Sequence, residues 1–258
     1  MHSRIRRFVA LMRPSTAPTG PSVVPQKSNP NAYSNAMLMI PTLNEEDAIA
    51  GIVKEAQSAG FSNILVVDGF SSDHTKDNAT GAGARVILQD FGKGKGCGIR
   101  TGMREFLAGH FELLCIIDGD GTNIPSDLTK MIPLAQDQRA DVVLGSRTRG
   151  TRGKGAMPTL SLTSNLTVSF LLGAKFGRFF TDVQTGYWVF TRPAVERVYP
   201  EIKSTGFEIE LELFVRILKD GLRVREVPVG FRRRIGSTKF SFRLRMRNLY
   251  HASRFLAS

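Results

Sequence analysis

The chain has 258 residues and a mass of 28.4 kDa, enough for one large α/β domain or two small ones. Its composition, 41% hydrophobic and 22% charged, excludes wholesale disorder, collagen and coiled coil. Its two cysteines cannot form a disulfide framework or a four-ligand zinc site, and they suggest a reducing compartment. The sequence contains no run of eighteen apolar residues, so it predicts no ordinary membrane-spanning helix.

The net charge of +12 is concentrated at the two ends of the chain. Residues 1–36 hold five basic residues and no acidic one, and residues 223–258 hold ten basic residues against Glu226. The stretch 37–222, with 20 basic and 22 acidic residues, is nearly neutral. This distribution favours an enzyme held to an anionic surface over a nucleic-acid-binding module, which stays as the alternative of another class. We therefore expect a cytoplasmic protein on the cytoplasmic face of a membrane, without a nucleic-acid partner.

The first 36 residues are rich in Pro, Ser, Asn and Ala and show no sustained period. They predict a disordered basic tail, with a basic membrane-touching or targeting segment as the alternative. The apolar part of RIRRFVALM is too short for a signal-peptide core.

From residue 37 the pattern alternates between short apolar runs and helical segments. Apolar runs predict strands at 37–40, 63–68, 84–88, 111–117 and 141–146. Such alternation predicts an α/β domain with a mainly parallel central sheet and helices on both faces. Ligands of these sheets bind beyond the carboxyl ends of the strands, where Asp68, Asp118 and Arg147 stand.

The chain after Arg147 changes character and then returns to the α/β pattern. A Gly- and Arg-rich loop (147–155) leads into a Ser/Thr/Leu segment, and a second α/β portion follows. That portion contains the motif 181–190, a helix over 207–219 and a strand over 223–229. We expect one domain over 37–239, followed by a basic amphipathic helix over 240–258 that docks on the membrane.

Asp118 and Asp120, in the segment IIDGDGTN, carry the strongest chemical signal. Residues two apart in extended backbone project to the same side, so both carboxylates can face one point. Two hard carboxylates at a strand end suit Mg²⁺ or Mn²⁺ held together with a substrate phosphate. An EF-hand is excluded because Thr129 stands where that loop requires Glu. A haloacid-dehalogenase-type phosphatase is set aside, because its aspartate strand would normally open the domain and three predicted strands precede this one. A pair of solvated turn aspartates remains as the alternative.

The glycine run FGKGKGCGIRTG (91–102) lacks the Ser or Thr that a P-loop places after its Lys. It does not follow the first strand, as a dinucleotide fingerprint would. It predicts either a loop whose amides and Lys95 approach a diphosphate, or a mobile solvated loop.

Seven motifs taken together resemble one family. They are IPTLNEEDAI (40–49), VVDGFSSDHT (66–75), GKGCGIRTG (94–102), DGDGT (118–122), VLGSR (143–147), DVQTGYWVF (182–190) and EVPVGFRRRIGSTKF (226–240). This series resembles the family 2 glycosyltransferases of GT-A fold. It is most similar to the branch that transfers mannose or glucose to dolichyl or other polyprenyl phosphates.

The resemblance implies an inverting, metal-dependent transferase with a nucleotide-sugar donor, GDP-mannose first and a UDP-hexose second. It implies a polyprenyl or dolichyl monophosphate acceptor, with a non-lipid acceptor as the alternative. Membrane docking would be peripheral or through a membrane-spanning partner. By position, it implies nucleotide-sugar contacts from Pro41, Leu43, Asn44, Glu45, Asp68, Lys95, Asp118, Gly119, Asp120, Arg234 and Lys239.

Asp118 and Asp120 would be the metal ligands, and Arg147 would bind phosphate at the active centre. Asp182 would act as a catalytic base, orient other groups or cap a turn. The sequence departs from the family at Gly69, where a second acid is common, and at Thr122, where many mannosyltransferases have Gln or His.

Overall fold

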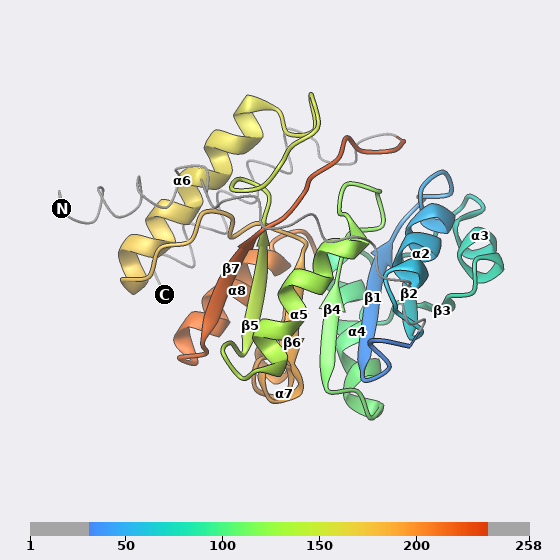
Figure 1. Ribbon diagram of the computed structural model, residues 1–258, viewed down its shortest axis with the longest axis horizontal. Coiled ribbons are helices and arrows are strands. Elements are labelled where there is room, and N and C mark those ends of the chain that lie inside the picture. Colours follow the sequence, from blue (N-terminus) through green and yellow to red (C-terminus); the bar gives the residue numbers. More distant parts are fainter. Residues whose placement is uncertain (1–30, 237–258) are drawn as a thin grey trace.

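A seven-stranded sheet forms the centre of the protein in the computed structural model, which describes residues 31–236 (Figure 1). The strand order across the sheet is β3-β2-β1-β4-β6-β5-β7. The strands are β1 (Ala36–Thr42), β2 (Ile64–Asp68), β3 (Arg85–Leu88), β4 (Leu113–Ile116), β5 (Val142–Ser146), β6 (Trp188–Thr191) and β7 (Val224–Pro228). The predicted α/β fold with a mainly parallel sheet is confirmed.

One strand reverses direction. β6 pairs antiparallel with both β4 and β5, whereas every other pair in the sheet is parallel. The reason lies in the path of the chain, because the segment after β5 stays at the carboxyl edge of the sheet (Figure 1). β6 therefore starts at that edge and runs back through the sheet. The sequence analysis marks 181–190 as a motif of a second α/β portion but predicts neither this strand nor its direction.

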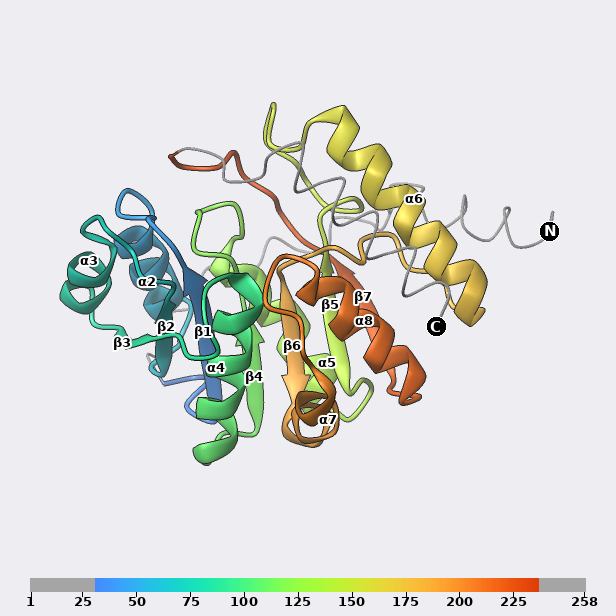
Figure 2. The same ribbon diagram turned by 180° about the vertical axis from the view of Figure 1, so that it is seen from behind.

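Helices cover both faces of the sheet (Figures 1 and 2). They are α2 (Ile49–Ser58), α3 (Thr75–Gly81), α4 (Lys95–Ala108), α5 (Leu128–Gln136), α6 (Thr159–Phe176), α7 (Arg192–Val198) and α8 (Ile209–Lys219), with short 3₁₀ turns at Pro125–Asp127 and Tyr199–Glu201. The apolar sides of α2 and α5 pack on one face, and those of α4, α7 and α8 pack on the other. α5 and α7 are absent from the sequence-based expectations.

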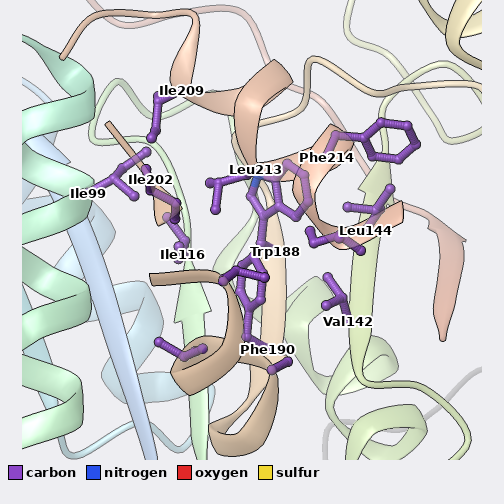
Figure 3. Packing of buried hydrophobic residues seen from close by; sticks show 14 of the residues in the cluster. Ile99, Ile116, Val142, Leu144, Trp188, Phe190, Ile202, Ile209, Leu213 and Phe214 are labelled. Atoms are coloured by element: carbon purple, nitrogen blue, oxygen red, sulfur yellow. The ribbon is translucent and has the colours of Figure 1, made fainter. Parts of the chain in front are cut away.

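Trp188 lies in the larger of the two cores (Figure 3). Its ring stacks on Phe190 with centroids 5.5 Å apart, and its indole N–H donates to the Thr185 carbonyl over 2.7 Å. Burial of this large ring beside Leu144 and Phe214 fixes β6 between its two neighbours.

α6 stands apart from the two helical layers, beyond the carboxyl ends of β5 and β7 (Figures 1 and 2). It buries one side, including Asn165 and Val168, while Leu160 and Leu171 are exposed. No helix within residues 31–236 is long and apolar enough to cross a membrane. The expected helix over 240–258, Lys239 and most of the N-terminal tail lie outside the described residues.

Candidate active site

A cavity of about 660 Å³ opens at the carboxyl ends of β1, β4 and β5. It brings together most of the residues that the sequence selects. Those that line it are Pro41, Leu43, Glu45, Lys95, Asp118, Gly119, Asp120, Arg147 and Arg234. They come from five separate stretches of the chain, and the parallel strands explain their meeting, because their carboxyl ends share one edge of the sheet.

Asn44 and Asp68 do not line the cavity but shape the loops at its rim. The Asn44 N–H donates to Ser71 Oγ over 2.8 Å, and the Ser72 N–H donates to Asn44 Oδ1 over 2.8 Å. Asp68 is fully buried, and its Oδ2 accepts the Ser71 N–H over 3.0 Å. These bonds join the loops after β1 and β2. A direct contact of Asn44 or Asp68 with a nucleoside stays a prediction.

Lys95 and Asp118 form an ion pair in the wall of the cavity. Lys95 Nζ lies 2.6 Å from Asp118 Oδ1 and 2.6 Å from Oε1 of Glu210, which the sequence analysis missed. Burial opposes the charged form of Asp118, but the Lys95 ammonium outweighs it and lowers the pKa of this carboxyl. Burial dominates at Glu210 and raises the pKa of that carboxyl, although Lys95 acts in the opposite direction. Burial also opposes the charge on Lys95, yet the two carboxylates raise its pKa.

Asp120 forms an ion pair with Arg234. Its Oδ2 lies 2.5 Å from an Arg234 guanidinium nitrogen, and the same guanidinium contacts Glu45. Asp120 Oδ1 accepts from the Thr122 hydroxyl over 2.6 Å and from the Thr122 N–H over 3.0 Å. Arg234 reaches these partners because the Ile235 N–H donates to the Asp120 carbonyl over 3.1 Å. Residues 231–236 thus cross the cavity beside the Asp120 loop.

Arg147 is the most tightly fixed cation of the site. Its Nε and one terminal nitrogen donate to the two oxygens of Asp182, each over 2.8 Å. The Arg147 N–H and the Asn165 amide also donate to Asp182 over 2.8 Å, and Gln184 accepts through its carbonyl over 2.7 Å. Burial opposes the charge of Arg147, but Asp182 outweighs it and raises the pKa of the guanidinium. Asp182 is fully buried behind Arg147, which is the geometry of an orienting residue.

Glu226, on β7, supports this arrangement from behind and is another residue that the sequence analysis missed. Its carboxylate accepts the N–H groups of Thr181 and Asp182, each over 2.9 Å. Burial raises the pKa of Glu226 to about 7. A chain of buried polar contacts therefore runs from Glu226 through Asp182 to Arg147.

Both polar and apolar side chains line the cavity. Sequence reasoning missed the lining residues Gln89, Asn165, Gln184, Phe207, Glu210 and Phe231. The sequence predicts a helix over 207–219, but nothing local in it places Glu210 against Lys95, 115 positions away.

The donor set fits a divalent cation held jointly with a ligand. Within residues 31–236 no group of three or more His, Cys, Asp or Glu side chains could hold a metal ion alone. Asp118 and Asp120 both line the cavity, and each already pairs with a cationic side chain, so positive charge is stabilised there. Mg²⁺ and Mn²⁺ commonly use one or two protein carboxylates and complete their coordination with phosphate oxygens and water.

Comparisons with known proteins agree with this architecture. The sequence profile of glycosyl transferase family 2 matches residues 37–199. Glycosyltransferase AglJ of Haloferax volcanii is 35% identical over 195 residues, 75% of this chain. The match spans 62% of AglJ, so the chain covers less than two thirds of that relative. Polyprenol monophosphomannose synthase of Mycolicibacterium smegmatis is 29% identical over 218 residues, 80% of each chain.

A solved structure supports the fold independently. Glucosyl-3-phosphoglycerate synthase of Mycobacterium tuberculosis, solved with Mn²⁺ and UDP-glucose, superposes with a TM-score of 0.67 at 17% identity. The superposition covers 86% of this chain and 79% of the synthase. At this identity the likeness concerns the fold, and it confirms the predicted GT-A-type architecture.

Proposed function

The chain belongs to glycosyl transferase family 2, and from that premise we propose that it moves a hexose from a nucleotide sugar to a polyprenyl monophosphate with inversion. One observation carries the proposal. The cavity holds a pair of carboxylates suited to a metal diphosphate and, at the end of β5, a guanidinium fixed by a buried carboxylate. A donor and an anionic acceptor can therefore be bound within one cavity.

On the donor side, Asp118 and Asp120 would hold Mg²⁺ or Mn²⁺. The metal would neutralise the leaving nucleoside diphosphate. Lys95 and Arg234 already lie beside these carboxylates and would bind phosphate oxygens, while Gly119 lets the backbone pass close to the nucleotide. The structural relative crystallised with Mn²⁺ and UDP-glucose supports this use of the cavity.

On the acceptor side, Arg147 would bind the phosphate of the lipid. A guanidinium can grip two phosphate oxygens at once, and the bonds to Asp182 and Gln184 fix its direction. A phosphate monoester has a second pKa of about 6, so it arrives largely deprotonated near neutral pH and already nucleophilic. Its oxygen would attack the anomeric carbon from the face opposite the leaving diphosphate. No base is needed to activate it, which agrees with a buried, orienting Asp182.

We propose mannose, delivered from GDP-mannose, as the transferred sugar, and a UDP-hexose as the second choice. The similarity to polyprenol monophosphomannose synthase supports mannose. Thr122 argues for keeping the second choice, because many mannosyltransferases have Gln or His there.

We propose that the protein works on the cytoplasmic face of a membrane, docked peripherally or through a membrane-spanning partner. Leu160 and Leu171 are exposed on α6, the helix whose Ser161, Ser164 and Asn165 line the cavity, and Met157, Pro158 and Phe231 make the lining partly apolar. The strongly basic ends of the chain would add attraction to anionic lipid.

The decisive experiment incubates the protein with Mn²⁺, polyprenyl phosphate and a panel of radiolabelled nucleotide sugars. We expect label in the organic phase with one donor, GDP-mannose first. Label confined to water-soluble product would indicate a non-lipid acceptor, and no transfer or donor hydrolysis with any donor would contradict the proposal.

A further inference from the structure

Lys95 bridges two carboxylates at the start of α4. Its ammonium lies 2.6 Å from one oxygen of Asp118 and 2.6 Å from one oxygen of Glu210, and its side chain is only 13% exposed. One cation therefore neutralises two largely buried anions. Asp118 has a proposed role as a metal ligand, whereas the proposed function gives Glu210 no role.

A close approach of two backbone segments brings Lys95 and Glu210 together. The Gly96 N–H donates to the Thr205 carbonyl over 2.9 Å, and a Cβ at Gly96 would lie 2.3 Å from the Ser204 carbonyl oxygen. The loop before α8 and the start of α4 therefore lie backbone against backbone. Only a residue without a side chain permits this approach, and it brings Lys95 and Glu210 together.

Asp118 cannot serve the Lys95 ammonium and a divalent cation at full strength together. Two cations on one carboxylate repel each other, and the repulsion is strong in a partly buried site. Lys95 must then weaken its bond to Asp118 when a metal ion binds. The second carboxylate that pairs with Lys95 belongs to Glu210 on α8, and this ion pair does not depend on Asp118.

We infer that Glu210 is a positioning residue that keeps the Lys95 ammonium in the cavity wall when Asp118 turns to a divalent cation. The inference rests on the proposed function, because it assumes that Asp118 is a metal ligand. With Glu210 in place, Lys95 gives up one of its two partners and stays beside the donor diphosphate. Without Glu210, Asp118 would be the sole carboxylate partner of Lys95 among the described residues, and the ammonium would compete with the metal.

A double-mutant cycle on Mn²⁺ affinity tests the inference, with binding followed by electron paramagnetic resonance of the metal alone. The four proteins are the full chain unchanged, Glu210→Gln, Lys95→Met and the double variant. We expect Glu210→Gln to weaken Mn²⁺ binding about tenfold when Lys95 is present. In the Lys95→Met background the same change should alter affinity less than about twofold.

A direct effect of the Glu210 charge on the metal predicts a different result. Glu210→Gln would then weaken Mn²⁺ binding equally in both backgrounds, and this outcome overturns the inference. No loss in either background, or no Mn²⁺ binding by the unchanged chain, overturns it too. Because donor and lipid are absent, failure of sugar transfer would contradict the proposed function separately.

Two further variants guard against a trivial loss of folding. Glu210→Asp keeps the charge, and we expect it to retain Mn²⁺ affinity within about threefold of the unchanged chain; a loss as large as that of Glu210→Gln contradicts the inference. Glu196→Gln, on α7, removes a carboxylate that is 54% exposed and does not line the cavity, and it should leave Mn²⁺ binding unchanged. Thermal melting identifies any variant that fails to fold.

Discussion

The two sides of the cavity hold their charges in different ways. On the side of β1 and β4, two cations are shared among four carboxylates, with Lys95 between Asp118 and Glu210 and Arg234 between Asp120 and Glu45. On the side of β5, one cation, Arg147, is bound by both oxygens of one carboxylate. Shared pairs can be rearranged by a ligand, whereas a bidentate pair presents a fixed guanidinium. Under the proposed function, the cavity would combine an adaptable donor side with a preorganised acceptor side.

The largest expected effect is on the adaptable side. Asp120→Asn removes one of two proposed metal ligands, and we expect transfer to fall at least about a thousandfold, as for loss of a principal electrostatic group. Lipid phosphate binding should be unchanged, because Arg147 is untouched. Radiolabel transfer and lipid binding measured on the same preparation check both statements. Full activity of this variant, or of the unchanged protein in excess EDTA, would remove the metal from the mechanism.

The stability of the folded chain should depend on pH through Glu226, which lies behind Asp182 and Arg147. Its pKa is about 7 in the folded chain, above its ordinary value of 4.5. Because the pKa of Glu226 is higher in the folded chain than in the unfolded chain, the protonated carboxyl stabilises the folded chain. This stabilisation is present in full below about pH 4.5 and is lost as the pH rises through about 7. Two to three pKa units correspond to about 3 kcal/mol. Glu226→Gln removes this titration.

We therefore expect the stability of the unchanged chain, relative to Glu226→Gln, to fall by about 3 kcal/mol between pH 4.5 and pH 8. Urea denaturation at the two pH values measures the difference. A constant difference between the two proteins would mean that Glu226 does not titrate in this range. Glu196→Gln, with an exposed side chain, is the control.

Arg147→Lys tests whether the acceptor side depends on fixed geometry. Lysine keeps the charge but cannot bind both oxygens of Asp182 or of a phosphate in the same way. We expect kcat/KM for the lipid to fall about 30-fold, or about 2 kcal/mol, with nucleotide binding unchanged. Restoration of full activity by lysine would show that charge alone suffices. Unchanged lipid and nucleotide kinetics in Arg147→Ala would exclude the residue from the site.

The smallest effect concerns membrane docking beside the acceptor side. Leu160 and Leu171 on α6 are 59% and 43% exposed. Changing both to Ser should weaken flotation with anionic vesicles about tenfold, the equivalent of about 1.4 kcal/mol. Leu88→Ser is the matched control, because this leucine is 52% exposed on β3, at the far edge of the sheet. Equal flotation of both variants would assign docking to another surface.

The sequence predicts the site residues that follow strands better than those that lie inside a helix or a strand. Asp118, Asp120 and Arg147 follow buried apolar runs, so their place at the carboxyl edge is predictable from strand pattern alone. Glu210 and Glu226 lie within a helix and a strand, where an acidic residue ordinarily faces water. Their roles depend on contacts with Lys95 and Asp182, 115 and 44 positions away, which no local pattern encodes.

The fold shows the same division. Short apolar runs predict the strands, because buried parallel strands are apolar throughout. The direction of β6 and the isolated position of α6 depend on the route of the chain between residues 147 and 187, and that stretch has no period that fixes its route. The role of 240–258 in membrane docking stays a prediction, since these residues lie outside the described part of the chain.

The antiparallel strand β6 also sets the spacing between β4 and β5. It lies between β4, which leads to the proposed metal ligands, and β5, which leads to Arg147. Two strand-to-strand intervals of roughly 4.8 Å each separate the two ends by about 10 Å. Under the proposed function, β6 adds one strand interval to the distance between the proposed metal ligands and the proposed acceptor-phosphate site. That added distance would make room for the sugar ring between the two phosphates.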